Sequence, residues 1–186
     1  MTAFCRLHSG GIVRNGLAVL LVGPSGAGKS TLVVRLVIDG FSLLSDDEVW
    51  IDPESRLVHP TTRSLLLKES AWDLFPDHRD RFVRSEEKEC RSWWLSAEDL
   101  RPGCRAAPSP VWGLIVVKPQ SGDRPSLEEI GQTEALSHVL MESMNFPEVR
   151  DAGLSALVNI VRSARLFRLT NGDLNECADI LSGVLP

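Results

Sequence analysis

The chain has 186 residues, of which 43% are hydrophobic and 24% charged, and this composition fits one globular domain rather than a disordered, collagen-like or membrane-spanning protein. A formal net charge of -5 gives no basic surface for nucleic acid or anionic lipid, so we expect neither as a partner. Four widely spaced cysteines and the lack of a signal-peptide-like apolar run predict reduced thiols and a cytoplasmic protein.

The N-terminal elements alternate between strand and helix. Residues 3–22 predict two strands joined by a turn at Asn15-Gly16. The second strand, residues 17–22, is apolar throughout, which is typical of a strand buried on both faces. A largely covered helix is expected over residues 31–39, with Gly40 as its C-cap.

Acidic residues follow the next predicted strand. Residues 41–45 predict a short strand directly before Asp46 and Asp47. Residues 49–51 and 56–59 then predict an antiparallel pair of strands across a Pro-containing turn.

Residues 68–110 show little periodicity. Within them, residues 77–91 contain ten charges of mixed sign. Two interpretations stay open: a solvated, mobile surface segment, or a lid or substrate-docking loop.

The C-terminal part of the chain again alternates strands and helices. We expect a buried strand at 111–117, helices at 133–144 and 151–164, a strand at 166–169 and a last helix from Asp173, its cap, to about residue 185. The whole of residues 1–186 is therefore predicted to form a single α/β domain.

One motif carries strong chemical information. The pattern Gly-x-x-x-x-Gly-Lys-Ser at residues 23–30 matches the phosphate-binding P-loop (Walker A), and it stands between a buried strand and a helix, as the mechanism requires. Its glycines allow positive φ, and backbone amides with the helix N-terminus favour phosphate. Lys29 would reach the β- and γ-phosphates, and Ser30 would bind Mg²⁺. The predicted nucleotide-binding residues are Gly23, Ser25, Gly26, Ala27, Gly28, Lys29, Ser30 and Thr31.

The acidic residue that usually completes such a site is not at the end of the later buried strand, which runs into Lys118 and Pro119. A guanine-reading Asn-Lys-x-Asp motif is also absent. Asp46 and Asp47 are the alternative, because the carboxyl ends of parallel strands meet at one ligand crevice. Adjacent residues in an extended chain point to opposite sides, so one carboxylate could orient Mg²⁺ while the other accepts the proton of an incoming hydroxyl.

These residues resemble a known family. His8, the P-loop, the apolar helix ended by Gly40 and the Leu-Leu-Ser-Asp-Asp run at 43–47 look like the catalytic domain of HPr kinase/phosphorylase, and more closely like the shorter HPr kinase-like proteins. The resemblance is specific over residues 8–52 and loose over 111–186. It implies a P-loop fold related to phosphoenolpyruvate carboxykinase, with a central mixed sheet flanked by helices.

The resemblance also implies an activity: ATP- and Mg²⁺-dependent transfer of the γ-phosphoryl group to a seryl hydroxyl of a peptide or small protein. By this mapping Asp46 is the base, Lys29 and Ser30 hold phosphate and Mg²⁺, Asp47 is the metal-side acid and His8 lines the site. The separate N-terminal domain and the downstream Gly-Arg-Gly-type signature have no counterpart here, so neither HPr as substrate nor the phosphorylase reaction is implied.

Several questions stay open at this level. A small-molecule kinase with an arginine-rich lid and a non-catalytic nucleotide-sensing module are the alternatives. The acceptor, the phosphoryl donor and the oligomeric state are not determined by the sequence, and one of the adjacent Trp93 and Trp94 is expected either to face a ligand or to pack beneath the loop. The arginine that would stabilise the transition state has six candidates, none assignable: Arg79, Arg81, Arg84, Arg101, Arg105 and Arg124.

Overall fold

The computed structural model describes residues 4–61, 64–84, 92–119 and 124–186, and its centre is a mixed β-sheet. In the described residues this sheet has eight strands, in the order β10-β11-β9-β2-β1-β4-β5 with β3 beside β1, and β5 also pairs with the start of β9. The pairs β2–β9 and β9–β11 are parallel. The strands are β1 (Cys5–Arg14), β2 (Leu17–Val22), β3 (Ser42–Ser45), β4 (Glu48–Ile51), β5 (Leu57–His59), β9 (Ser109–Lys118), β10 (Ser126–Glu129) and β11 (Arg165–Thr170). The predicted α/β class and mixed sheet are confirmed.

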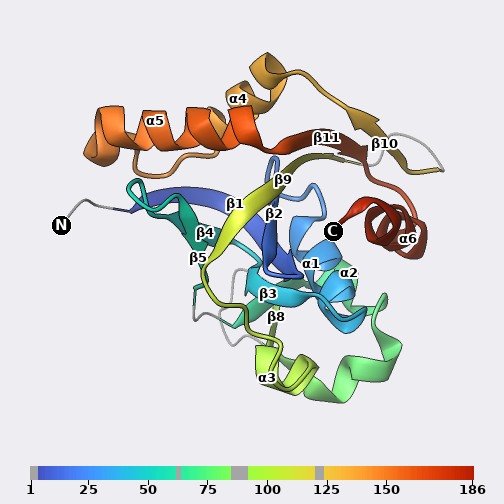
Figure 1. Cartoon of the computed structure of the whole chain (residues 1–186). Coiled ribbons are helices and arrows are strands. Elements are labelled where there is room, and N and C mark those ends of the chain that lie inside the picture. Colours follow the sequence, from blue (N-terminus) through green and yellow to red (C-terminus); the bar gives the residue numbers. More distant parts are fainter. Residues whose placement is uncertain (1–3, 62–63, 85–91, 120–123) are drawn as a thin grey trace.

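Helices cover both faces of this sheet. Helices α1 (Lys29–Ile38) and α6 (Leu174–Val184) pack on one face, and α4 (Gln132–Met141) and α5 (Phe146–Ser163) pack on the other (Figure 1). Successive residues of β2 alternate between the two resulting cores: Leu21 packs with α1, and Leu20 packs with α5. The uninterrupted apolar run of this strand is therefore buried on both faces, as predicted.

Most predicted boundaries lie within a few residues of the observed ones. The first turn has positive φ at Asn15 and Gly16, and the Asp173 side chain accepts hydrogen bonds from the N–H groups of residues 175 and 176 as the cap of α6. Helix α5 differs, because it begins at Phe146 and is interrupted at Arg150, where φ is 42°. Within the described residues, no helix combines the length and apolar character needed to cross a membrane.

The segment with little periodicity, residues 68–110, contains short helices and strands where it is described. Together with the residues just before it, the described part of this segment forms a second, three-stranded antiparallel sheet in the order β6-β8-β7, which we call the small sheet. Apolar side chains from this region, including Leu65, Leu67, Phe82 and Leu95, pack in the same core as α1. Its elements are β6 (Leu65–Lys68), α2 (Glu69–Trp72), a 3₁₀ helix (Pro76–Arg81), β7 (Val83–Arg84), β8 (Ser92–Leu95) and α3 (Ala97–Leu100), and residues 85–91 of the charged run lie outside the described residues.

The path of β1 determines where functional residues can gather. β1 is antiparallel to both β2 and β3, so these two strands run in the same direction on either side of it and end at the same edge of the sheet. β3 and β4 follow one another along β1, and the break between them consists of Asp46 and Asp47. Ser9 of β1 is paired with Val22 at the end of β2, and its N–H donates to the carbonyl of Asp47 (3.0 Å). The loop after β2 and the two aspartates are therefore separated by a single strand.

Candidate functional site

The loop between β2 and α1, residues 23–28, has the backbone conformation that its glycines permit. Gly23, Gly26 and Gly28 have φ angles of 149°, 83° and 96°. A Cβ atom on Gly23 would collide with the carbonyl of Val117 in β9, and one on Gly28 would collide with the side-chain amide of Asn171. The expectation of positive φ is confirmed, and close packing against β9 and Asn171 excludes larger residues at two of these positions.

Lys29, the first residue of α1, is folded back onto this loop. Its ammonium group donates to the carbonyls of Gly23 (2.5 Å) and Pro24 (3.2 Å), and the residue is only 6% exposed. Burial lowers the pKa of the Lys29 ammonium below that of an ordinary lysine; the negative charges of Glu142 and Asp47 oppose this shift and the positive charge of Lys68 adds to it. A buried cation therefore stands at the start of α1, where the helix dipole also favours an anion.

Asp46 is buried next to α1, the helix that begins with Lys29. The residue is 4% exposed, and its carboxylate oxygen Oδ2 accepts a hydrogen bond from the N–H of Leu66 in β6 (2.8 Å). The Ser30 hydroxyl donates to the backbone carbonyl of Asp46 (3.3 Å). A contact to each of two other elements thus fixes this aspartate at the end of β3.

Asp47 lines the same cavity as Asp46 but contacts other residues, and the two form a bend between β3 and β4 rather than the extended chain that the sequence suggested. Its side chain is 57% exposed, and its Oδ1 lies 3.4 Å from Nε2 of His8. Nδ1 of the same imidazole lies 2.6 Å from Oε2 of Glu142, and the His8 N–H donates to the Glu142 carbonyl (2.9 Å). His8 is therefore held between two carboxylates, one from each side of β1.

Glu142 is a site residue that the sequence did not reveal. It follows α4 as one acid among many, without a motif or a characteristic spacing. Tertiary pairing of β1 with residues 142–144 brings it to His8, and no sequence signal for that pairing stands out.

These groups surround one cavity of about 390 Å³. Six predicted loop and helix residues line it, with His8, Asp46 and Asp47; Gly23 and Ala27 shape the loop without lining the cavity. The small sheet and α2 form the remaining wall. The lining residues are His8, Ser25, Gly26, Gly28, Lys29, Ser30, Thr31, Asp46, Asp47, Ser64, Leu66, Leu67, Lys68, Ser70, Ala71 and Trp94.

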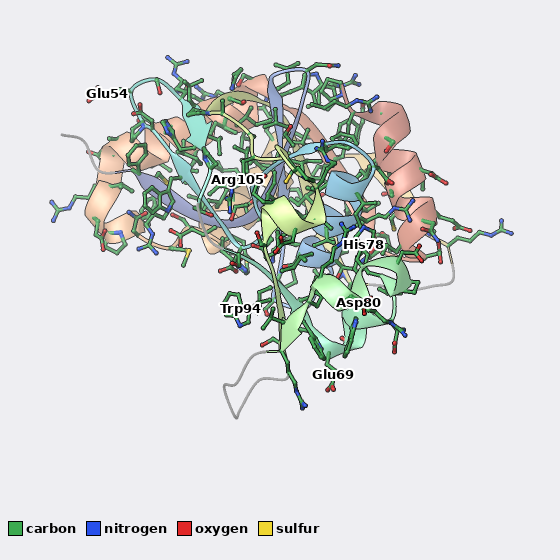
Figure 2. All side chains as sticks on the ribbon, turned by 90° about the horizontal axis from the view of Figure 1, so that it is seen from below. Glu54, Glu69, His78, Asp80, Trp94 and Arg105 are labelled. Atoms are coloured by element: carbon green, nitrogen blue, oxygen red, sulfur yellow. The ribbon has the colours of Figure 1, made fainter. Side chains whose placement is uncertain are left out.

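The two adjacent tryptophans have different environments. Trp93 packs against Trp72, with ring centroids 3.6 Å apart, and Trp94 is 39% exposed. Figure 2 shows Trp94 projecting outward from the small sheet. One indole thus stabilises the small sheet, and the other stands at the edge of the cavity.

The six arginine candidates lie away from this lining. Arg79 pairs with Asp73, Arg81 donates to carbonyls of α3, and Arg101 donates to three carbonyls at the end of α1 and after it. Arg105 donates to the carbonyl of Thr61.

Glu48, the third acid after β3, is buried and paired with Arg6, so it acts in the fold rather than at the cavity.

The cavity combines groups suited to a phosphate-bearing ligand. It offers the start of a helix, two lysines and the Ser30 hydroxyl on one side, and the carboxylates of Asp46 and Asp47 on the other. Within the described ranges, no three His, Cys, Asp or Glu side chains converge to hold a metal ion. Mg²⁺ commonly takes one or two carboxylates together with ligand phosphates, so these residues fit a metal that enters with its nucleotide.

Comparisons with known proteins give similarity to solved structures only, and it is distant. Neither a protein-family model nor a curated protein matches the chain. Among solved structures, the Hpr(Ser) kinase/phosphatase from Coxiella burnetii is similar, with 16% sequence identity over 67% of this chain and 70% of that chain and a TM-score of 0.39. At this distance the similarity assigns no activity to the chain.

Proposed function

We propose that the protein is a Mg²⁺-dependent phosphotransferase that moves the γ-phosphoryl group of ATP to a seryl hydroxyl of a peptide or small protein. One observation supports this above all others. The glycine-rich loop, Lys29 and Ser30 share a single cavity with two aspartates that come from the opposite side of β1. A site for phosphate alone would not need carboxylates there, whereas phosphoryl transfer requires both kinds of group.

Nucleotide binding would use the loop and the first turn of α1. The backbone of residues 23–28 and the positive end of the helix dipole would surround the β- and γ-phosphates. Lys29 would exchange its bonds to the carbonyls of Gly23 and Pro24 for bonds to phosphate oxygens. Ser30 and Asp47 would hold Mg²⁺, which would draw negative charge from the phosphates. The exposed position of Asp47 leaves room for the water ligands that Mg²⁺ keeps.

Asp46 is the group we assign as the base. Its carboxylate is oriented by the Leu66 N–H and lines the cavity beside Ser30. In the transfer step the seryl oxygen would form a bond to the γ-phosphorus while the bond to the β,γ-bridging oxygen breaks. The seryl proton would pass to Asp46, and ADP would leave with the electron pair of the broken bond.

His8 and Glu142 would position the second carboxylate. Glu142 orients the imidazole through Nδ1, so that Nε2 faces Asp47. A polar side chain beside an otherwise exposed carboxylate restricts its rotamers and keeps it directed toward the cavity.

The acceptor would approach from the small sheet. Leu66 and Trp94 line the cavity and are both partly exposed, at 38% and 39%. They are directly opposite one another on β6 and β8, so they form a continuous apolar surface next to the carboxylates. Such a surface is suited to the side chains that flank a serine in a polypeptide, and it supports a peptide or protein acceptor over a small polar metabolite.

The test is incubation with γ-labelled ATP, Mg²⁺ and a cell lysate, followed by identification of the labelled species. Asp46→Asn should retain ATP affinity and lose transfer by about 100-fold or more, as expected for removal of a general base. Asp151→Asn is the matched control, because this aspartate is exposed on α5. Label on a metabolite would identify a small-molecule kinase, and binding without any labelled product would identify a nucleotide sensor.

Asp47→Asn separates the roles of the two aspartates. It should raise the Mg²⁺ concentration needed for half-maximal transfer, whereas Asp46→Asn should leave that concentration unchanged. The reverse pattern would exchange the two assignments.

A further inference from the structure

Transfer of a phosphoryl group needs positive charge on the transferred group as well as on the nucleotide. That charge is often supplied by an arginine from a second structural element. The six arginine candidates lie outside the cavity lining. Among the described residues of the lining, Lys68, the last residue of β6, is the second lysine beside Lys29.

Lys68 extends over the loop from the opposite wall. Its ammonium nitrogen lies 3.9 Å from the position that a Cβ atom on Gly26 would occupy. Its positive charge also reaches Lys29, whose pKa it helps to lower. The two ammonium groups therefore face the same part of the cavity, Lys29 from α1 and Lys68 from the small sheet.

The side chain of Lys68 is available for a ligand. It is exposed, and it forms no hydrogen bond or ion pair with any residue that the structure describes. Lys29, by contrast, is buried and already bonded to two carbonyls of the loop. Two ammonium groups that face the same space repel one another, and an anion bound between them would remove that repulsion.

The position of Lys68 is linked to that of the proposed base. Leu66, two residues earlier in β6, donates its N–H to the Asp46 carboxylate. Leu67, between them, is buried in the core next to α1. These two contacts hold β6 in place. The position of Lys68 relative to Asp46 is therefore fixed by the strand.

We propose that Lys68 is a catalytic residue that binds the transferred phosphoryl group in the transition state, in the place where related reactions use an arginine. This inference rests on the proposed function. It assigns to Lys29 the contacts with the bound nucleotide and to Lys68 the charge that develops on the phosphoryl group during transfer.

The experiment measures binding and needs no acceptor. The dissociation constant of ADP is determined with Mg²⁺, with and without aluminium fluoride, which mimics the phosphoryl group in transfer. Wild-type protein should bind ADP about 100-fold more tightly with the fluoride. Lys68→Ala should bind ADP alone within about threefold of wild type and lose about tenfold or more of the fluoride-dependent gain. Lys68→Arg should keep most of that gain.

Arg162→Gln is the control for loss of one positive charge, because Arg162 is exposed on α5, on the other face of the main sheet. Its fluoride-dependent gain should equal that of wild type. A full gain in Lys68→Ala would overturn the inference, as would an equal loss of affinity for ADP alone. Wild-type protein that binds ADP without any gain would overturn the inference but leave nucleotide binding intact, whereas wild-type protein that binds no ADP would overturn the proposed function itself.

Discussion

At the scale of single residues, Gly28 shows how closely the loop conformation is determined. It combines a φ of 96° with a neighbour, Asn171, that would collide with any Cβ atom. Asn171 is held in turn by its side-chain bond to the Ala27 carbonyl (2.9 Å) and by its N–H bond to the Lys118 carbonyl (3.1 Å). The strands that end beside the loop thus fix its shape from outside.

Gly28→Ala is therefore expected to affect both stability and binding. The left-handed backbone should cost about 1–2 kcal/mol in the free energy of unfolding, and displacement of Asn171 should weaken ATP binding by about tenfold or more. Gly40→Ala is the matched control, because Gly40 has a φ of 105° but open space around its Cβ position. Urea unfolding and ATP titration of both variants check this. Equal ATP affinity in the two variants would contradict the role of the loop.

Lys29 gives a prediction about pH. Its pKa is lowered chiefly by burial, so the ammonium loses its proton at a lower pH than an ordinary lysine does. Only the protonated form attracts phosphate, and affinity for ATP should therefore fall as the pH rises through this lowered pKa. Lys29→Arg keeps its charge throughout, so the affinity it retains should not fall over the same range. Affinity of the wild type that stays constant up to the ordinary lysine range would contradict this prediction.

At the scale of elements, the sequence was informative where one pattern dominates. The apolar run of β2, the glycine-lysine motif and the apolar face of α1 each have one structural interpretation, and these elements position the loop. The small sheet could not be predicted, because its strands are only two to four residues long and none shows a clear alternation of apolar and polar residues. In β6, Leu65 and Leu67 are buried and Leu66 is exposed, an alternation that three consecutive leucines hide. Lys68 and Glu142 could not be recognised for a different reason: only tertiary contacts bring Lys68 to the cavity and Glu142 to His8.

The adjacent tryptophans of β8 give a prediction about the packing of the small sheet. Trp93 packs on Trp72, and Trp94 is partly exposed at the cavity. Trp93→Ala should lower the free energy of unfolding by about 2–4 kcal/mol, because it leaves a void in the core. Trp94→Ala should lower it by less than about 1 kcal/mol. Urea denaturation of the two variants provides the comparison. A similar loss of unfolding free energy in the two variants would contradict the packing of Trp93 on Trp72.

At the scale of the whole molecule, the cavity depends on two sheets that share one core. The main sheet supplies the loop and the aspartates, and the small sheet supplies Lys68 and Trp94. Leu65, Leu67 and Leu95 of the small sheet pack in the same cluster as the apolar side chains of α1. This shared burial indicates that the small sheet is not an independent folding unit.

We therefore expect a single cooperative unfolding transition. Three of the five tryptophans, Trp72, Trp93 and Trp94, lie in α2 and the small sheet. Tryptophan fluorescence therefore reports mainly on this part of the molecule, whereas far-UV circular dichroism reports on all helices and strands. In wild-type protein both signals should change at the same urea concentration, because separation of the small sheet would expose the core next to α1. Mg²⁺ and ATP should move both midpoints upward together, by an amount that grows with the logarithm of ligand concentration above the dissociation constant. A fluorescence change at lower urea than the circular dichroism change would show that the wall carrying Lys68 opens separately, and the fixed distance between Lys68 and Asp46 would then not hold.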